Sequence, residues 1–491
     1  MLYFRMVLIM GVTLYTSRVV LNTLGVKDFG IYNVVGGVVV LFAFLNNAMS
    51  IATQRFISFE LGKNDLIETK RVFSMSMTIH LCIIVLVIIL AETVGIWFLN
   101  TQMNFPIERM KVVNWVYQFS LITTCIGIIR VPYNASIIAH EKMSFYAYIG
   151  MAEAIFKLLI VFLLIYVGFD KLKTYSILTC VVTFCIFLSY KYYCNKKIGT
   201  SFYHFFWDQN LFKRLLSFSG WSLMGGVVTV GANQGGNILL NIFNGVAVNA
   251  AMGISNQVNA AIYGFVSNFQ GAFNPQIVKL YAVKREEELE RLICRAAKFS
   301  FLLLFLLAFP IILNIDFVLY IWLKKNVHYA STFCILIILF SFIEALAAPL
   351  WTAIQATGDI KKYQLVLAPV IGLNVLLSYI FLKMKYSPEI VLEVKVLVNI
   401  LCLVIRLYFV RNIIKLTTFY REVLLRVVAV FILTLPLFIF FHHYNEGWIK
   451  LATSTVFFYV SMLFIIYYIG LNRIEKVFVK RYMAKYFIRK H

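Results

Sequence analysis

Hydrophobic residues along this chain form long runs separated by short polar connections. Each run covers roughly 18 to 25 residues, which lets a helix cross a hydrocarbon core about 30 Å thick. The pattern predicts fourteen membrane-spanning helices, at about 3–22, 31–53, 74–99, 112–132, 145–168, 174–190, 216–242, 247–273, 296–322, 330–354, 364–382, 391–410, 424–441 and 451–471.

The predicted helices fall into two sets of six, followed by a last pair. In each set the second helix and its exit share one plan: residues 25–71 and 245–291 both start with Gly-Val, continue through a polar helix and leave through a cationic segment. Equivalent positions and orientations predict two lobes related by a pseudo-two-fold axis along the membrane normal, with a substrate site between them. The domains predicted are an N-lobe at 1–190, a basic amphipathic cytoplasmic linker at 191–215, a C-lobe at 216–411, and the last two helices with a basic cytoplasmic tail at 412–491.

Composition agrees with this reading. The 491 residues are 61% hydrophobic and only 14% charged, and the mean hydropathy is +0.84. Such a chain is too apolar for a soluble protein with one buried core. We therefore expect an all-α polytopic membrane protein.

Charge placement orients the chain in the membrane. The even-numbered connections and the C-terminal tail hold roughly two thirds of the 45 Lys and Arg residues, and cytoplasmic loops carry such an excess. Both termini are therefore expected in the cytoplasm. The net charge of +23 is spread over many short loops, which favours contact with anionic membrane lipids and argues against nucleic acid.

Cysteines and the N-terminus suggest no processing or cofactor. The eight cysteines include no CxxC pair, so neither a disulfide framework nor a metal site is implied, and no cofactor is expected. The first hydrophobic run lacks a cleavage site and should itself serve as the insertion signal. Because Met1 lies almost at the membrane boundary, a start codon about a dozen residues upstream is expected.

Amides and hydroxyls are concentrated in the second, seventh and eighth predicted helices, too densely for helices that face lipid on all sides. They either line a wet cavity or hydrogen-bond across close helix contacts. Amides that line a cavity would suit sugar hydroxyls and water equally well. The candidate cavity residues are Asn46, Asn47, Asn233, Gln234, Asn237, Asn256, Gln257 and Asn259.

Charged residues inside the predicted helices are few. Arg18 lacks a local partner, and an unpaired cation in a membrane normally faces a protein interior or a water-filled cavity, so Arg18 is a candidate substrate contact. Glu153 and Lys157 lie one turn apart and either neutralise each other or take part in coupling. Glu344 has no local partner and is a candidate protonatable group.

Three further cations lie where predicted helices meet the cytoplasm. Arg55, Arg130 and Lys279 could recruit an anionic headgroup, although topology alone already places cations there.

No motif points to an enzyme. A nucleotide-binding GxxxxGK[ST] loop is missing from the sequence. A membrane-embedded polymerase or acyltransferase would carry acids, bases or a metal site on a sizeable aqueous loop, and the predicted external loops are short. We expect a transporter.

One segment carries a family resemblance. RVVLNTLGVKDFGIYNVVGGVVVLF, followed by LNNAMSIATQRFISFELGKND, resembles the start of the Wzx-type polysaccharide and O-antigen flippases. These belong to the multidrug/oligosaccharidyl-lipid/polysaccharide exporter superfamily. The likeness is specific over about residues 14–72, fair over 216–291 and architectural elsewhere.

The resemblance implies a function. A flippase of this kind carries an undecaprenyl-pyrophosphate-linked oligosaccharide from the cytoplasmic to the periplasmic leaflet of the bacterial inner membrane by alternating access. Cavity cations would contact the pyrophosphate; Arg18 lies in the matched segment and Arg55 in its QRF element. A polysaccharide polymerase and a chain-length regulator are the implied protein partners.

Two alternatives differ in their expected chemistry. A multidrug exporter driven by Na⁺ or H⁺ would favour carboxylates in its cavity, because its substrates are cationic. A membrane-embedded polymerase or acyltransferase would need a long external loop. A net positive cavity would favour the flippase, and a net negative one the drug exporter.

Overall fold

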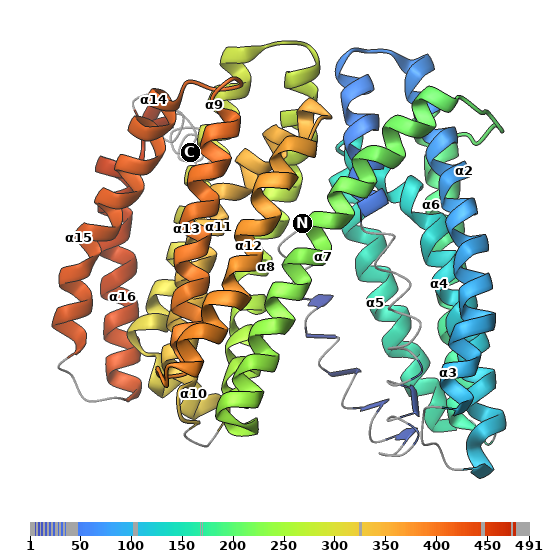
Figure 1. Ribbon diagram of the computed structural model, residues 1–491, viewed down its shortest axis with the longest axis horizontal. Helices are drawn as coiled ribbons and strands as arrows, with labels where there is room; N and C mark the ends of the chain where they lie inside the picture. The colour runs from blue at the N-terminus through green and yellow to red at the C-terminus, as the bar shows by residue number, and fades with distance from the viewer. Residues whose placement is uncertain are drawn as a thin grey trace, which may run out of the picture. The chain divides into compact units, whose positions relative to one another are not determined.

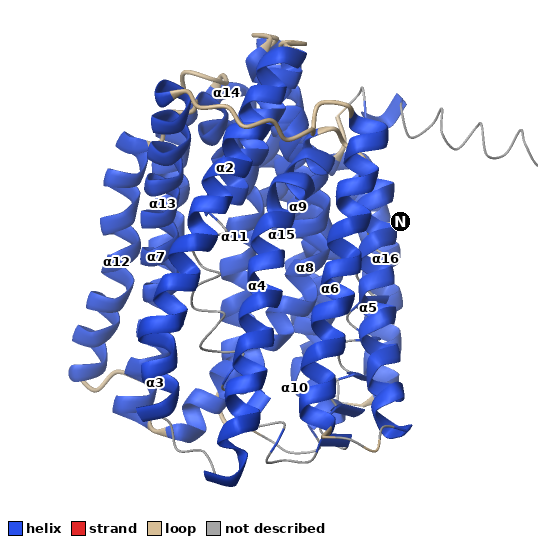
Figure 2. Cartoon of the chain, turned by 90° about the vertical axis from the view of Figure 1, so that its right-hand side faces the viewer, coloured by secondary structure: helices blue, strands red, loops and turns tan. Residues whose placement is uncertain are grey.

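The computed structural model describes residues 5, 8–9, 11–12, 15–16, 19–20, 23–24, 28, 31–32, 35, 48–101, 107–166, 168, 170–323, 327–442, 447–472 and 475–477. Within these residues the chain consists of helices joined by short connections, without a strand (Figures 1 and 2). The predicted all-α fold is confirmed.

The helices follow one another with few intervening residues (Figure 1). Residues 48–62 are also helical and precede α2. The bounds are α2 (Leu66–Leu90), α3 (Ile96–Thr101), α4 (Met110–Ala139), α5 (Met143–Tyr166), α6 (Lys171–Tyr193), α7 (Gln209–Asn244), α8 (Val246–Ala282), α9 (Glu286–Leu313), α10 (Ile315–Leu323), α11 (Ala330–Thr357), α12 (Lys361–Lys383), α13 (Ile390–Val410), α14 (Leu416–Phe419), α15 (Leu425–His442) and α16 (Trp448–Ile465). Five-residue π-helical segments lie at Ala91–Gly95, Cys194–Ile198, Tyr420–Leu424 and Ile466–Gly470, and a 3₁₀ turn lies at Ile107–Arg109.

Predicted spans from 74–99 onward coincide with helices, and ten helices of the described chain are long and apolar enough to cross a membrane. The first two predicted spans lie mostly outside the described residues. The predicted span 296–322 differs, because α9 ends at Leu313 and α10 begins at Ile315. Between them, buried Asn314 donates from Nδ2 to Pro310 O (3.0 Å) and to Ser454 Oγ (2.9 Å). The amide thereby satisfies backbone that the interruption frees.

Aspartates begin two of these helices. The carboxylate of Asp65 accepts a hydrogen bond from Glu68 N at 2.9 Å, at the start of α2. Asp170 likewise accepts from the backbone N–H groups of Leu172 and Lys173, at the start of α6. Each side chain satisfies donors that have no partner within the first helical turn.

The chain divides into two compact units. Unit 1 comprises Met1–Gly226, Asn274–Lys284 and Gly358–Lys361, and unit 2 comprises Val227–Phe273, Arg285–Thr357 and Lys362–His491. Helices α7 and α8 contribute to both units. At 36 residues and about 1.5 Å per residue, α7 is about 54 Å long and exceeds the hydrocarbon thickness.

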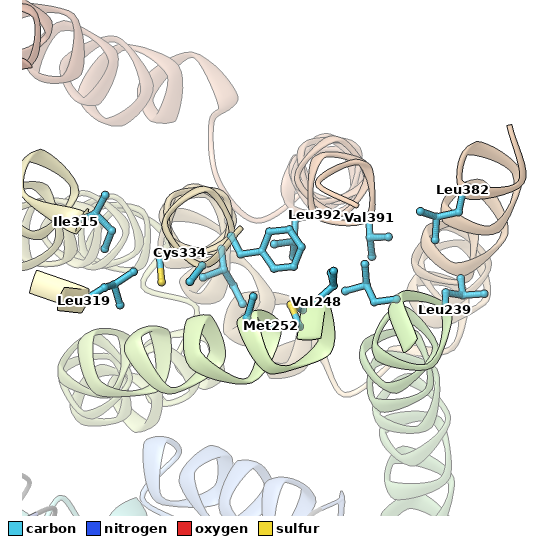
Figure 3. Packing of buried hydrophobic residues seen from close by; sticks show 14 residues of the cluster. Leu239, Val248, Met252, Ile315, Leu319, Cys334, Leu382, Val391 and Leu392 are labelled. Carbon is cyan, nitrogen blue, oxygen red and sulfur yellow. The ribbon is translucent and has the colours of Figure 1, made fainter. Parts of the chain in front are cut away.

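Each unit has its own apolar core. In unit 1, α4 packs against α2, α5 and α6, and buried Val113, Val116 and Tyr117 of α4 belong to its core. In unit 2, α11 packs against α9 and α13, and the core around Phe333 and Cys334 includes residues from α7, α8 and α13 (Figure 3). These cores fix the helices that carry the polar side chains described next.

The surface of the helices is strongly apolar. On α16, Val456, Leu463 and Phe464 are all more than 60% exposed, while Phe458 and Met462 of the same helix are fully buried. Exposure of such an apolar surface to water would be costly, whereas contact with lipid hydrocarbon would not be. The exposed faces therefore suit contact with lipid.

Candidate functional site

A polar cavity of about 320 Å³ lies in unit 1, among α4, α5, α6 and the N-terminal residue Arg5. Its charged lining residues are two arginines and one glutamate, so its net charge is positive, and we call it the cationic cavity. The lining residues are Arg5, Thr124, Gly127, Ile128, Arg130, Val131, Asn134, Tyr146, Gly150, Glu153 and Tyr190.

Glu153 pairs with two cations, one of which lines this cavity. Its Oε2 accepts from Arg130 Nη1 at 3.0 Å, across from α4, and its Oε1 accepts from Lys157 Nζ at 2.8 Å, one turn later on α5. Glu153 is 20% exposed, Arg130 27% and Lys157 44%. The sequence pairs Glu153 with Lys157 through their spacing, but gives no sign of the contact with Arg130, which lies 23 residues away.

Arg5 is a cavity residue that the sequence did not identify as a candidate. Its guanidinium lies 4.3 Å from the centre of the Tyr146 ring, a cation–π contact. It also lies against Gly150, where an added Cβ would overlap Arg5 Nε. The glycine therefore makes room for the guanidinium on α5.

A second cavity, of about 480 Å³, lies in unit 2 and carries no charge. Gln234, Asn237 and Asn241 succeed one another along one face of α7, and Asn249 and Asn256 do the same on α8. Gly245, with φ of +82°, turns the chain between the two helices. The remaining lining residues are Ile238, Ile242 and Gly253.

The predicted amides separate into groups. Gln234, Asn237 and Asn256 line the second cavity, where Asn237 Nδ2 donates to Gln234 Oε1 at 3.2 Å. Asn233 and Gln257 are exposed on the same two helices.

Asn259 belongs to neither group. Its Oδ1 accepts from Ser341 Oγ of α11 at 2.6 Å, as expected for an amide that joins helices. Asn46, Asn47 and Arg18 lie outside the described residues.

Lys279 and Arg55 lie in unit 1 away from the cationic cavity. Lys279 Nζ donates to Glu141 Oε1 at 2.6 Å, and Gln276 Nε2 donates to Glu141 Oε2 at 3.1 Å. Burial acts to raise the pKa of Glu141, but the bonds from Lys279 and Gln276 outweigh it and hold that pKa below its usual value. A headgroup would have to compete with Glu141 for Lys279.

Two glycines permit close packing around these cations. A Cβ on Gly62 would come within 2.7 Å of Lys279 O, so the helix of residues 48–62 touches α8 at backbone level. A Cβ on Gly358, whose φ is +80°, would lie 2.7 Å from Arg55 Nη2. The guanidinium of Arg55, 5% exposed, lies 4.6 Å and 4.7 Å from the ring centres of Phe56 and Phe59. Arg55 is therefore held in packed surroundings.

Glu344 has a partner distant in the sequence. Arg406 of α13 donates from Nη1 to Glu344 Oε2 at 3.0 Å and from Nε to Tyr363 Oη at 3.1 Å. Arg406 is only 10% exposed. The predicted helix at 391–410 contains Arg406, and the structure places this cation inside the unit 2 bundle. The spacing of Lys395, Asn399 and Arg406 along one face of α13 is a signal that could have indicated this.

Comparison with known proteins defines the fold. The MatE family model matches residues 236–380. An outward-facing multidrug resistance MATE transporter of the MOP superfamily superposes with a TM-score of 0.70 at 16% identity, over 84% of this chain and 94% of the other. A MATE structure in the straight conformation gives the same TM-score, identity and coverage.

A third similar solved structure differs in its binding pocket. It is a MOP superfamily transporter from Pyrococcus furiosus, described by "reverse polarity of binding pocket suggests different function"; the TM-score is 0.69 at 16% identity, over 85% of this chain and 95% of the other. Among curated proteins no sequence match is found. The chain is a multi-pass membrane protein with the fold of the MATE transporters of the MOP superfamily. The similar structures described here are of transporters, not of enzymes.

Proposed function

We propose that the chain is a flippase that moves an undecaprenyl-pyrophosphate-linked oligosaccharide from the cytoplasmic to the periplasmic leaflet of the bacterial inner membrane. Both termini would lie in the cytoplasm, and the product would serve surface polysaccharide synthesis. A polysaccharide polymerase and a chain-length regulator would be its protein partners.

The charge of the unit 1 cavity carries this proposal. Arg5 and Arg130 outnumber Glu153 there, and Glu153 is already paired with Arg130 and Lys157. A diphosphate needs guanidinium donors, which bind phosphate oxygens through charge-assisted hydrogen bonds. An organic cation would instead need a free carboxylate, and the carboxylate of Glu344 in unit 2 is likewise paired, with Arg406.

The uncharged cavity of unit 2 suits the other part of such a substrate. Sugar hydroxyls both donate and accept hydrogen bonds, and amide side chains offer both functions without charge. Five amides on α7 and α8 line this cavity. The amides of this cavity therefore suit the glycan of such a substrate.

Binding of undecaprenyl diphosphate to the purified protein in nanodiscs tests the proposal, with native mass spectrometry as the measurement. Arg130→Ala should weaken binding about tenfold or more, because it removes a charge-assisted donor. Arg291→Ala is the matched control, because Arg291 is 62% exposed and pairs with Glu287 outside both cavities. Equal binding by wild type and Arg130→Ala would contradict the proposal.

A multidrug exporter is the second candidate, because a similar solved structure is described as a multidrug resistance transporter. Tetraphenylphosphonium is a suitable probe in the same nanodiscs. An exporter of organic cations should bind it, and Glu153→Gln should weaken that binding. The flippase should bind it no better than an empty nanodisc does.

A further inference from the structure

The cationic cavity of unit 1 is partly occupied by its own carboxylate, Glu153, and the role inferred for this residue rests on the proposed function. Its two carboxylate oxygens each take one cation, Arg130 at 3.0 Å and Lys157 at 2.8 Å. A carboxylate in this position satisfies donors that a phosphate oxygen would otherwise use. The cavity therefore contains a built-in competitor for an anionic ligand.

The cavity also holds polar atoms without partners. Within the described chain, Arg5 Nε and Asn134 Oδ1 are buried and make no hydrogen bond. Arg5 lies at the cavity between the Tyr146 ring and Gly150. A guanidinium has five N–H donors, and a buried one without partners is costly, so Arg5 is suited to an incoming acceptor.

Glu153 can release Arg130 without being left alone. Lys157 lies one turn further along α5, and it would continue to neutralise the carboxylate after Arg130 turned to another anion. Arg130 also lies 5.6 Å from the ring centre of Tyr190, a contact independent of Glu153. The arrangement therefore permits exchange of one anion for another on Arg130.

We propose that Glu153 is an internal counter-ion, displaced from Arg130 by a diphosphate group that Arg130 and Arg5 then hold together. The cavity volume of about 320 Å³ falls at the lower end of the range for small-ligand pockets. Return of Glu153 to Arg130 would expel the headgroup, so the glutamate favours release as much as it opposes binding.

The test measures binding of two probes in nanodiscs. Inorganic pyrophosphate reports a soluble anion site, and undecaprenyl diphosphate reports a lipid headgroup site. Glu153→Gln, which keeps the shape of the side chain, should tighten binding of undecaprenyl diphosphate about tenfold and slow its dissociation. Glu92→Gln is the control, because it removes the same charge from unit 1 away from the cavity. Equal gains in both variants, or no gain in Glu153→Gln, would overturn the proposal.

Two variants test the part of Arg5. Arg5→Ala removes the guanidinium, and Gly150→Ala displaces it while its charge stays in the chain. Both should weaken binding of undecaprenyl diphosphate, and normal binding in both would exclude Arg5 from the site. Thermal unfolding of each variant verifies that it is folded.

The outcomes also separate this inference from the proposed function. Tighter pyrophosphate binding by Glu153→Gln, without any transport of a lipid-linked glycan by wild type, would support the counter-ion and reject the flippase. Glycan transport that Glu153→Gln leaves unchanged, together with unchanged binding, would support the flippase and reject the counter-ion.

Discussion

The two units handle charge in opposite ways. Unit 1 brings Arg5, Arg130 and Glu153 to the wall of a cavity. Unit 2 lines its cavity with amides and keeps Glu344 and Arg406 in a separate network with Tyr363. Arg130 lies at a cavity where it can exchange one anion for another, whereas Arg406 is only 10% exposed and its removal leaves the Glu344 carboxylate without this partner. The difference predicts that equivalent substitutions in the two units have different consequences.

The largest expected effect comes from Arg406→Ala. Removing this cation takes a hydrogen-bond donor from both the Glu344 carboxylate and the Tyr363 hydroxyl. We expect a loss of about 3 kcal/mol in the free energy of unfolding. Arg130→Ala should lose about 1 kcal/mol or less, since Glu153 retains Lys157. Reversible denaturation in mixed detergent micelles measures both.

A double variant distinguishes two causes of the lost stability, an unpaired buried charge and the loss of side-chain packing. Arg406→Met combined with Glu344→Leu removes both members of the pair and should regain part of the loss. If Arg130→Ala were as destabilising as Arg406→Ala, the contrast between the units would not hold.

The next effect concerns the uncharged cavity. Asn237→Leu combined with Asn256→Leu removes two amides that line it, and at about 1 kcal/mol for each lost hydrogen bond the transport of a glycan-bearing lipid should fall about tenfold or more. Binding of undecaprenyl diphosphate without a glycan should not change. Proteoliposome transport and nanodisc binding provide the two measurements.

Asn233→Leu is the matched control for this pair, because Asn233 is an exposed amide of α7 that does not line the cavity. A loss of diphosphate binding in the double variant would contradict the proposal that these amides contact the glycan.

The smallest effect is expected for Glu141, which lies away from both cavities. Its pKa is lowered in the folded chain, so its contacts with Lys279 and Gln276 stabilise above the unfolded pKa of about 4.3 and are lost as pH falls through the folded pKa. Glu141→Gln should therefore cost less than about 1 kcal/mol at pH 7 and less still near pH 3.5. Unfolding midpoints at the two pH values measure it; a gap that widens in acid would contradict this sign.

Much of the fold could be predicted from the sequence, because hydrophobic runs of membrane length have few alternatives to a helix. Hydropathy does not determine where a helix ends. Arg406 lies within the predicted helix at 391–410, but neither its ion pair nor the interruption at Asn314 could be predicted from hydropathy. The ion pair of Arg406 gives no local signal in the sequence, because its partner Glu344 lies 62 residues away.

The candidate site was harder to predict, because its members come from several helices. The spacing of Glu153 and Lys157 was informative, whereas the contact of Glu153 with Arg130 depends on how α4 packs against α5. Arg5 gave no signal, because its place depends on the space left by Gly150 on another helix. The amides were identified by type, and only their order along α7 and α8 separates cavity lining from helix contact.

Gly62 has a consequence for the tolerance of this chain to mutation. Even a methyl group there would meet the main chain of α8 at Lys279, and a main chain cannot rotate away as a side chain can. Every one of the nineteen other amino acids is thus larger than the space available. In a library of all single substitutions, position 62 should accept its original residue alone, whereas exposed Lys63 beside it should accept many.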